Sequence, residues 1–548
     1  MSIMIEGNAW TVCPGANQRE FPSSDSSSRE IWGYFDALSY WKNDLAQLWV
    51  HTTAPFFDMT VTRDGAAPVT VLTLRDCPGR RQKTPEDAFA VGCGWEDPVL
   101  IQTGNDWPPG AYAVKLIARY ADGSRAEGEA FFALKRPPGE KRPDAVLVLT
   151  TSTWTAYNDW GGANHYRSVV DGKASDAPAP VLSRRRPWAR GFIELPAEAP
   201  RHTGVPDLPR FGVPAFPWLT WALNNGYSRH YLDAGWAHYE RPFVVWAENN
   251  GYDLDVITQD DLHADPACLT GYKTAIFVGH DEYWSADMRA TVDAFVDSGG
   301  AVARFAGNFI WQVRIEGVDG DPHALQVCYK APEADPLFRT HPSRTTTFWD
   351  SAIVNRPGAA TFGVTGAQGC YARFGLCSPR GSGAFTVYRP FHWALTDTDL
   401  QYGDLLGPDP SRIATFELDG VDYTFRQGLP YATGIDGAPE NLEIIALAPA
   451  TLGERVRPGV PHAAPLAEVQ ALEAAAPTFY ASESAMPREY GSGVVASFTR
   501  HRGEVFCAGA CHWVNGLIHH DEAVEIITRN VLNRFAKRGH DALTAGLD

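Results

Sequence analysis

Ala275-Ile-Phe-Val-Gly-His-Asp-Glu-Tyr-Trp284 combines an apolar run with a dense polar cluster. A short apolar run closed by glycine is typical of a buried strand in a parallel sheet, because such strands are covered on both faces. The residues that follow then lie at the carboxyl end of a strand, where open α/β sheets bind ligands. We therefore predict an α/β fold with a ligand site around His280 and Glu282.

Strands and helices alternate on both sides of this segment. Besides 275–278, the apolar runs that predict buried strands are 145–150, 254–257 and 301–306. Helical spacing of apolar residues follows at about 243–251, 288–298 and 524–535. This alternation indicates βαβ units and a parallel sheet.

The region before residue 138 has a different pattern. Short stretches between about 30 and 135 alternate in the manner of strands and are separated by turn sequences such as Trp107-Pro-Pro-Gly. This spacing predicts an Ig-like antiparallel β-sandwich over residues 1–138. A polar, proline-rich linker at 135–143 leads into an α/β domain over 139–548, and a Gly/Pro-rich segment at about 320–490 is predicted to be a β-rich insertion.

Composition excludes several classes of partner. The net charge of −18 argues against nucleic acid and anionic membranes, which need clustered basic residues. No apolar run approaches the ~18 residues of a membrane-spanning helix, and residues 1–7 lack the features of a signal peptide. Nine cysteines without framework spacing predict reduced thiols and a cytoplasmic protein. Cys507, Cys511 and His512 could suggest zinc, but core packing is the favoured interpretation.

Three polar clusters follow predicted strands at their carboxyl ends. They are Trp154–Tyr166, His280–Trp284 and Gly307–Trp311. Because the carboxyl ends of parallel strands meet at one edge, we expect these clusters to converge. A Gly-X-Ser-X-Gly or Gly-X-Cys-X-Gly elbow, a GxGxxG motif and a P-loop are all missing, so neither an elbow nucleophile nor nucleotide binding is supported.

The motifs Thr153-Trp-Thr-Ala-Tyr-Asn-Asp-Trp-Gly-Gly162, His280–Trp284, Phe305-Ala-Gly-Asn308 and Ala508-Gly-Ala-Cys-His-Trp513 resemble the large (beta) subunit of N,N-dimethylformamidase. The resemblance covers roughly 145–535. It implies a flavodoxin-like, class I glutamine-amidotransferase-like core that has lost the cysteine nucleophile of that fold. It also implies a mononuclear iron, held by two tyrosines and one glutamate, and hydrolysis of an amide C–N bond.

Carried over by motif, the resemblance makes Tyr157, Tyr166 and Glu282 the ligands of a ferric ion. His280 and Asn308, with Glu282, are the implied catalytic residues. Two phenolates and a carboxylate form a hard oxygen donor set, which suits ferric iron better than zinc or copper. The substrate implied is a small N-substituted amide or formamide. We also expect a homo-oligomer, and the family implies a small companion subunit.

Other interpretations stay open at this stage. The family carries a late Gly-Tyr-Glu-X-Asp-like stretch, and its nearest match here, Tyr431–Asp436, lacks the glutamate. Tyr157 and Tyr166 could be core aromatics, and Glu282 could complement a helix dipole. The 18 tryptophans also allow a non-catalytic carbohydrate- or small-molecule-binding module. A third alternative is an oxygenase, although no 2-His-1-carboxylate set is apparent.

Overall fold

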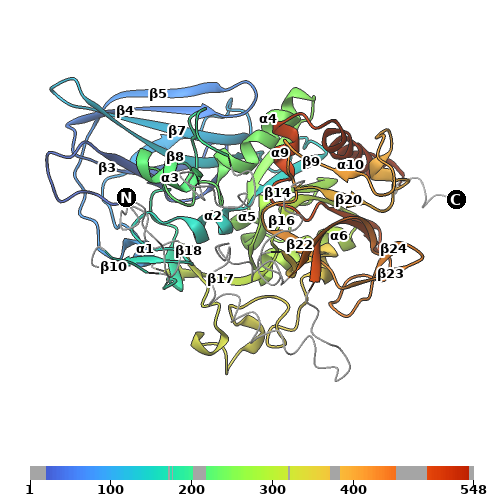
Figure 1. Ribbon diagram of the computed structural model, residues 1–548. Coiled ribbons are helices and arrows are strands. Elements are labelled where there is room, and N and C mark those ends of the chain that lie inside the picture. Colours follow the sequence, from blue (N-terminus) through green and yellow to red (C-terminus); the bar gives the residue numbers. More distant parts are fainter. Residues whose placement is uncertain are drawn as a thin grey trace.

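A nine-stranded sheet lies at the centre of the α/β region in the computed structural model (Figure 1). Its first five strands are mutually parallel: β13 (Leu254–Thr258), β9 (Ala145–Leu149), β14 (Thr274–His280), β16 (Ala301–Gly307) and β27 (Gly503–Cys507). The remaining strands are antiparallel: β26 (Tyr490–Arg500), β25 (Glu443–Thr451), β20 (Phe385–Val387) and β21 (Leu405–Leu406). The α/β fold predicted from the sequence is therefore confirmed, with a sheet that is parallel in its first half.

The structure describes residues 20–170, 173–175, 177–201, 217–318, 321–370, 383–451 and 490–541. The N-terminal residues 1–7, and the parts of the predicted insertion at 371–382 and 452–489, lie outside the described residues. None of the described helices has the length and apolar character needed to cross a membrane. Six described cysteines are free thiols: Cys77, Cys93, Cys268, Cys328, Cys507 and Cys511.

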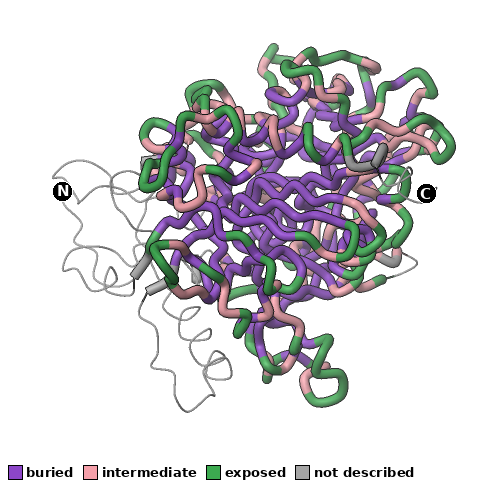
Figure 2. The backbone as a smooth tube through the Cα atoms, turned by 90° about the vertical axis from the view of Figure 1, so that its right-hand side faces the viewer, coloured by how far each residue is buried: buried purple, intermediate pink, exposed green. Residues whose placement is uncertain are grey.

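Helices cover both faces of the sheet. Ile276 and Val278 of β14 belong to the core that includes α4 (Arg241–Asn249), α9 (Trp513–Ile518) and α10 (Glu522–Asp541). Ala275 and Phe277 point into the opposite core, with α5 (Gln259–Ala264) and α6 (Ala286–Asp297). Because successive side chains of a strand point to opposite faces, a strand covered on both sides has to be apolar throughout. Figure 2 shows the resulting block of buried strands.

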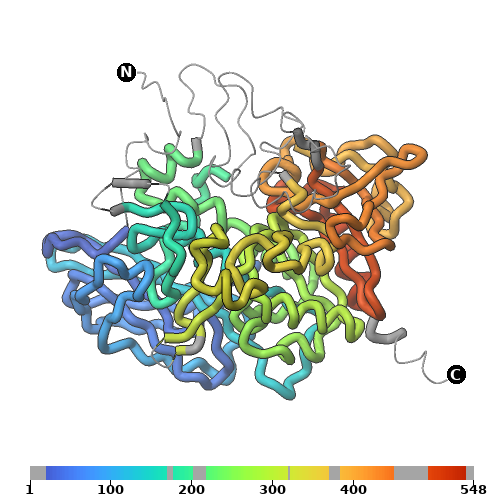
Figure 3. Tube along the Cα trace, turned by 90° about the horizontal axis from the view of Figure 1, so that it is seen from below, coloured from blue at the N-terminus to red at the C-terminus, as the bar shows by residue number. Residues whose placement is uncertain are grey.

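The N-terminal region forms two packed layers of strands. One sheet contains β1 (Ile31–Phe35), β3 (Leu45–Thr52) and β6 (Val99–Gln102). The other contains β2 (Ser39–Trp41), β8 (Arg125–Lys135), β7 (Gly110–Arg119), β4 (Phe56–Arg63) and β5 (Val69–Pro78). Both layers are antiparallel except where β2 pairs with β8 in parallel. Residues of both sheets share one hydrophobic core, and this region lies at the opposite end of the molecule from α10 (Figure 3). The Ig-like and amidotransferase-like identities of the two regions stay predictions, as do their boundaries.

The described strands of the predicted insertion are divided among several sheets. β19 (Thr365–Cys370) pairs with β22 (Leu418–Gly420), and β23 (Tyr423–Arg426) pairs with β24 (Leu429–Ala432), in two separate two-stranded sheets. β25, β20 and β21 extend the central sheet, because β25 pairs along its length with β26. β17 (Trp311–Val318) and β18 (Asp321–Val327) instead form a smaller sheet with β12 (Val181–Ser183) and β15 (Tyr283–Ser285). In that sheet Tyr283 pairs with Trp311, which joins two of the three polar clusters.

The other described elements connect or flank these sheets. They are α1 (Ala88–Val91), α2 (Thr151–Tyr157), β10 (Ser168–Val170), β11 (Lys173–Ser175), α3 (Pro217–Asn225), the π-helix η1 (Trp236–Glu240), the 3-10 helices η2 (Pro332–Ala334), η3 (Pro342–Arg344) and η4 (Trp393–Leu395), and α7 (Ala359–Phe362).

Replacement of Gly279 by alanine is expected to destabilise the protein strongly. Gly279 has a φ of +78°, and a Cβ atom there would lie 2.3 Å from Cγ of Tyr239. Backbone strain and overpacking together should cost about 3 kcal/mol, measured as the free energy of unfolding in urea. Gly251 is the matched control, because its φ is +81° and its Cβ would meet open space. Equal losses in the two alanine variants would show that the contact with Tyr239 does not matter.

Candidate active site

The predicted site residues converge at the carboxyl edge of the central sheet. Tyr157 is the last residue of α2, which begins directly after β9. His280 ends β14, and Asn308 directly follows β16, the neighbouring strand. Glu282 precedes β15 and accepts the backbone N–H of Trp311 through its carbonyl oxygen. The parallel order of the strands therefore brings together residues far apart in the sequence.

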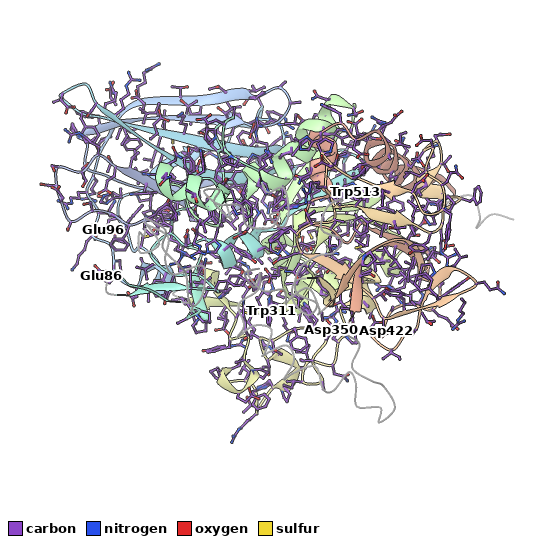
Figure 4. All side chains as sticks on the ribbon, viewed as in Figure 1. Glu86, Glu96, Trp311, Asp350, Asp422 and Trp513 are labelled. Carbon is purple, nitrogen blue, oxygen red and sulfur yellow. The ribbon has the colours of Figure 1, made fainter. Side chains whose placement is uncertain are left out.

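A hydrogen-bonded group of tyrosines surrounds the Glu282 carboxylate. Tyr166 Oη donates to Glu282 Oε1 at 2.5 Å, and Tyr157 Oη donates to Tyr166 Oη at 3.0 Å. Tyr283 Oη donates to Tyr166 Oη at 2.8 Å. The indole of Trp311, labelled in Figure 4, donates to Glu282 Oε1 at 2.8 Å. Tyr166 thus joins Tyr157 to Glu282 by hydrogen bonds, and the role of the three residues as metal ligands stays a prediction.

His280 connects this group to a second carboxylate. Its Nδ1 lies 2.7 Å from the carbonyl oxygen of Asp233, so Nδ1 carries a proton and Nε2 faces the site. Nε2 lies 3.3 Å from Glu282 Oε2 and contacts Glu417 Oε2. Asn308 Nδ2 donates to Glu417 Oε2 at 2.9 Å and lies 3.2 Å from His280 Nε2. His280 and Asn308 therefore occupy the same centre as the tyrosines.

Glu417 is the site residue that the sequence interpretation missed. The late carboxylate was sought in Tyr431–Asp436, but Asp436 accepts backbone N–H groups of Asp422 and Ala438 and does not contact the site. Glu417 is in the left-handed backbone region, with a φ of 42°. The sequence Glu417-Leu-Asp419 does contain a Glu-X-Asp pattern. This Glu-X-Asp pattern is the feature of the sequence that could have identified Glu417 as the late glutamate of the family.

The site concentrates ionisable groups in a buried volume. Burial, followed by Glu282 and Glu417, raises the pKa of Tyr157 well above its usual value. Burial likewise raises the pKa of Glu417 to about 7, although His280 opposes this change. For His280, burial opposes the charged form, yet Glu417 and Glu282 raise its pKa well above 6.5. A cation at this position would stabilise the ionised carboxylates and phenols.

The residues at this centre fit a metal ion. Ligand atoms of His280, Glu417 and Cys511 all lie within 4.8 Å of one another, and the three residues are buried. This triad could bind a metal. Glu282 Oε2, which faces His280 Nε2 at 3.3 Å, and the buried Asn308 Oδ1 leave further acceptor capacity at the same place. The set of Tyr157, Tyr166 and Glu282 and the set of His280, Glu417 and Cys511 thus lie next to each other.

The two donor sets differ in chemistry. Tyr157, Tyr166 and Glu282 offer only oxygen, which hard cations such as ferric iron prefer. The other set includes Cys511, and burial followed by nearby carboxylates raises the pKa of its thiol well above its usual value. The thiolate and the phenolate are the forms that bind metals, so a bound cation would have to lower the raised pKa of Cys511 in one set and of Tyr157 in the other. The surroundings therefore do not decide between the two sets.

The zinc interpretation of Cys507, Cys511 and His512 is not supported where the structure describes the chain. Cys507 Sγ accepts a hydrogen bond from Arg304 at 3.0 Å. His512 Nδ1 lies 3.1 Å from Thr415 Oγ1, and its ring stacks on Phe416 at 5.3 Å between centroids. Phe416 in turn contacts His280, with 5.8 Å between ring centroids. His512 thus helps to form an aromatic wall beside the site.

The carboxyl edge of the central sheet carries a buried cluster of tyrosine, carboxylate and histidine side chains. The protein is therefore an α/β protein with a candidate metal centre. The family model described as "N,N-dimethylformamidase beta subunit-like, C-terminal" matches residues 59–525. The chain belongs to this family. The family is named after N,N-dimethylformamidase, which is a hydrolase, and the words "beta subunit" in its name imply an enzyme of several subunits. The match begins within β4, so it includes part of β4 and all of β5, β6, β7 and β8 of the N-terminal layers.

Other comparisons add little. No curated protein matches this sequence. Spo0M, a sporulation control protein from Bacillus subtilis, is 11% identical with a TM-score of 0.15, and the match covers 20% of this chain and 49% of that one. Pectate lyase Pel3 from Pectobacterium carotovorum is 12% identical with a TM-score of 0.13, covering 22% and 31%. The chain spans about half of the first protein and less than a third of the second, and neither likeness carries an argument.

Proposed function

We propose that this protein is an iron-dependent amidohydrolase that cleaves the C–N bond of a small N-substituted amide or formamide. The observation that carries the proposal is the convergence of Tyr157, Tyr166 and Glu282 beside His280 and Glu417. Membership of a family named for dimethylformamidase supports the same reaction class.

Tyr157, Tyr166 and Glu282 would hold the iron. Their oxygens would form a hard, anionic donor set, and the hydrogen bonds from Tyr157 to Tyr166 and from Tyr166 to Glu282 hold the three side chains close to one another. When bound, a ferric ion polarises a substrate carbonyl and lowers the pKa of water. The Tyr283 hydroxyl and the Trp311 indole orient the ligands by hydrogen bonding to Tyr166 and Glu282.

His280 and Glu417 would move the protons, and Asn308 would donate a hydrogen bond. Water adds through its oxygen to the amide carbon and gives a proton to Glu417. The C–N bond breaks as His280 Nε2 gives a proton to the leaving amine, since Nδ1 is engaged by the Asp233 carbonyl. Asn308 contributes an N–H donor to the developing oxyanion. The products are a carboxylic acid and an amine.

Cys511→Ala is expected to keep its iron, whereas Tyr166→Phe is expected to lose it. The reason is that Tyr166 contacts Glu282 directly, while Cys511 belongs only to the alternative donor set. We would measure the metal content of both purified variants and the visible absorption of a ferric phenolate. These measurements show which of the two donor sets holds the metal. Loss of metal from Cys511→Ala with retention in Tyr166→Phe would assign the ion to His280, Glu417 and Cys511 instead.

The alternative of a carbohydrate-binding module loses its main support. Tryptophans in such modules are exposed, but no described tryptophan is exposed here. Several, including Trp154, Trp236 and Trp513, are completely buried in the core. The test is to incubate the protein with small amides and measure amine release. Release of amine indicates hydrolysis, whereas binding of the same compounds without turnover indicates a binding module.

We also propose that the protein acts in an assembly. The family is named for a beta subunit, which implies a partner subunit, and self-association is a separate prediction. Light scattering of the purified chain is expected to give a mass above 60.1 kDa, the mass of one chain. A mass equal to that of the monomer at micromolar concentration would contradict self-association.

A further inference from the structure

A buried charge network lies directly behind the site. Arg304 lies in the middle of β16, between β14 and β27, and is completely buried. Its Nε donates to Asp281 Oδ2 at 2.7 Å, and its Nη2 contacts Asp281 Oδ1, which gives a two-point pair. Its Nη1 contacts both Asp419 and, at 3.0 Å, Cys507 Sγ. One guanidinium thus holds two carboxylates from segments more than a hundred residues apart.

Each carboxylate is attached to a segment that carries site residues. Asp281 stands between His280 and Glu282 in the sequence. Asp419 follows Glu417 by two positions. Asp419 Oδ1 also accepts the backbone N–H of Phe309 at 2.9 Å, next to Asn308. Arg304 therefore contacts, directly or through Asp419, all three segments that supply His280, Glu282, Asn308 and Glu417.

The backbones of these segments also pack without spare room. A Cβ atom on Gly307 would lie 2.5 Å from the carbonyl oxygen of Glu417 and 2.7 Å from the backbone nitrogen of Cys511. The Cys511 N–H donates to that same carbonyl at 3.4 Å. A shift of the 417–419 segment would therefore be transmitted to the end of β16 and to Asn308.

Stability alone does not account for this network. Burying three charged groups costs desolvation free energy, and well-packed apolar residues are often equally stabilising. Burial raises the pKa of Asp281 to about 6 even though Arg304 opposes it. A planar guanidinium with two-point pairing instead fixes direction and distance, which a flexible ammonium does not. The network is suited to holding geometry.

We propose that Arg304 is a positioning residue for amide hydrolysis, which sets the distance between the His280–Glu282 segment and the Glu417 segment through Asp281 and Asp419. This inference rests on the proposed function for its effect on turnover. The positional role itself concerns only the three segments and is independent of any substrate.

The test compares Arg304→Lys and Asp419→Asn with Asp255→Asn. Asp255 is a matched control, because it is also buried and pairs with Arg136 Nε at 3.0 Å through both oxygens, but near the start of β13, at the opposite edge of the sheet. We expect Arg304→Lys and Asp419→Asn to lower kcat at least ten-fold with a smaller change in KM. Asp255→Asn should keep the wild-type kcat even if its melting temperature falls by a similar amount.

Hydrogen exchange measured by mass spectrometry gives a second readout. Both network variants should lose protection jointly at 281–283, 309–311 and 417–419, whereas Asp255→Asn should not. Folded variants with wild-type exchange at these segments and wild-type kcat would overturn the proposal. If Arg304→Lys does not fold, the isosteric Asp419→Asn and Asp281→Asn variants carry the test. If the wild-type protein neither binds metal nor releases amine, the proposed function fails, while the exchange pattern still decides the role of Arg304.

Discussion

Tyr157→Phe is expected to lose bound iron and its visible absorption, and to have no measurable amide hydrolysis, while remaining folded. The substitution removes only the hydroxyl group. The ring keeps its contacts with Tyr166, 4.6 Å away between centroids, and with His280, 5.2 Å away. Metal analysis, the visible spectrum and amine release from small formamides measure the effect.

Tyr112→Phe is the matched control for this variant. Tyr112 is also completely buried, and its hydroxyl donates to the Pro108 carbonyl at 2.6 Å within the N-terminal layers. It should keep full metal content and activity. Equal metal content and activity in Tyr157→Phe and wild type would remove Tyr157 from the ligand set.

Glu417→Gln is expected to reduce kcat/KM by about 10²-fold or more, because a positioned general base typically contributes that much. The base acts only when deprotonated, so wild-type activity should rise with pH. Burial raises the pKa of Glu417 to about 7, and a bound cation would lower that pKa. The increase of activity with pH is therefore expected at or below pH 7. The glutamine variant should lack this rise. Rates measured across pH 5–9 on purified protein test both statements.

Glu240 provides the control for this prediction. It is another buried glutamate whose pKa burial raises to about 7, and its Oε1 accepts hydrogen bonds from Thr150 and Trp154 rather than from site residues. Glu240→Gln should keep the wild-type rate and pH profile. Wild-type activity with an unchanged acidic limb in Glu417→Gln would exclude Glu417 as the base.

The parallel half of the sheet and its site edge could be predicted from local sequence. Segment 275–278 is apolar throughout because both of its faces are covered, and the polar residues start where the strand ends. That pattern placed His280 and Glu282 correctly at one edge. The motif resemblance added Tyr157 and Tyr166, which composition alone could not distinguish from core aromatics.

Other parts of the site have no local signal. Glu417 reaches His280 through a left-handed turn and through the bridge between Leu418 and Ala510, which are long-range contacts. The Arg304 network likewise joins residues 281, 304 and 419 by charge pairing across the fold. The short strands β20 and β21 could have belonged to any sheet, and only pairing with β25 assigns them to the central one.

The central claim is that Tyr157, Tyr166 and Glu282 hold one iron ion in the site. Elemental analysis of protein purified without chelators, after growth in iron-replete medium, tests it most directly. We predict close to one iron per chain. Protein without a transition metal under these conditions would contradict the assignment and, with it, the proposed hydrolytic mechanism.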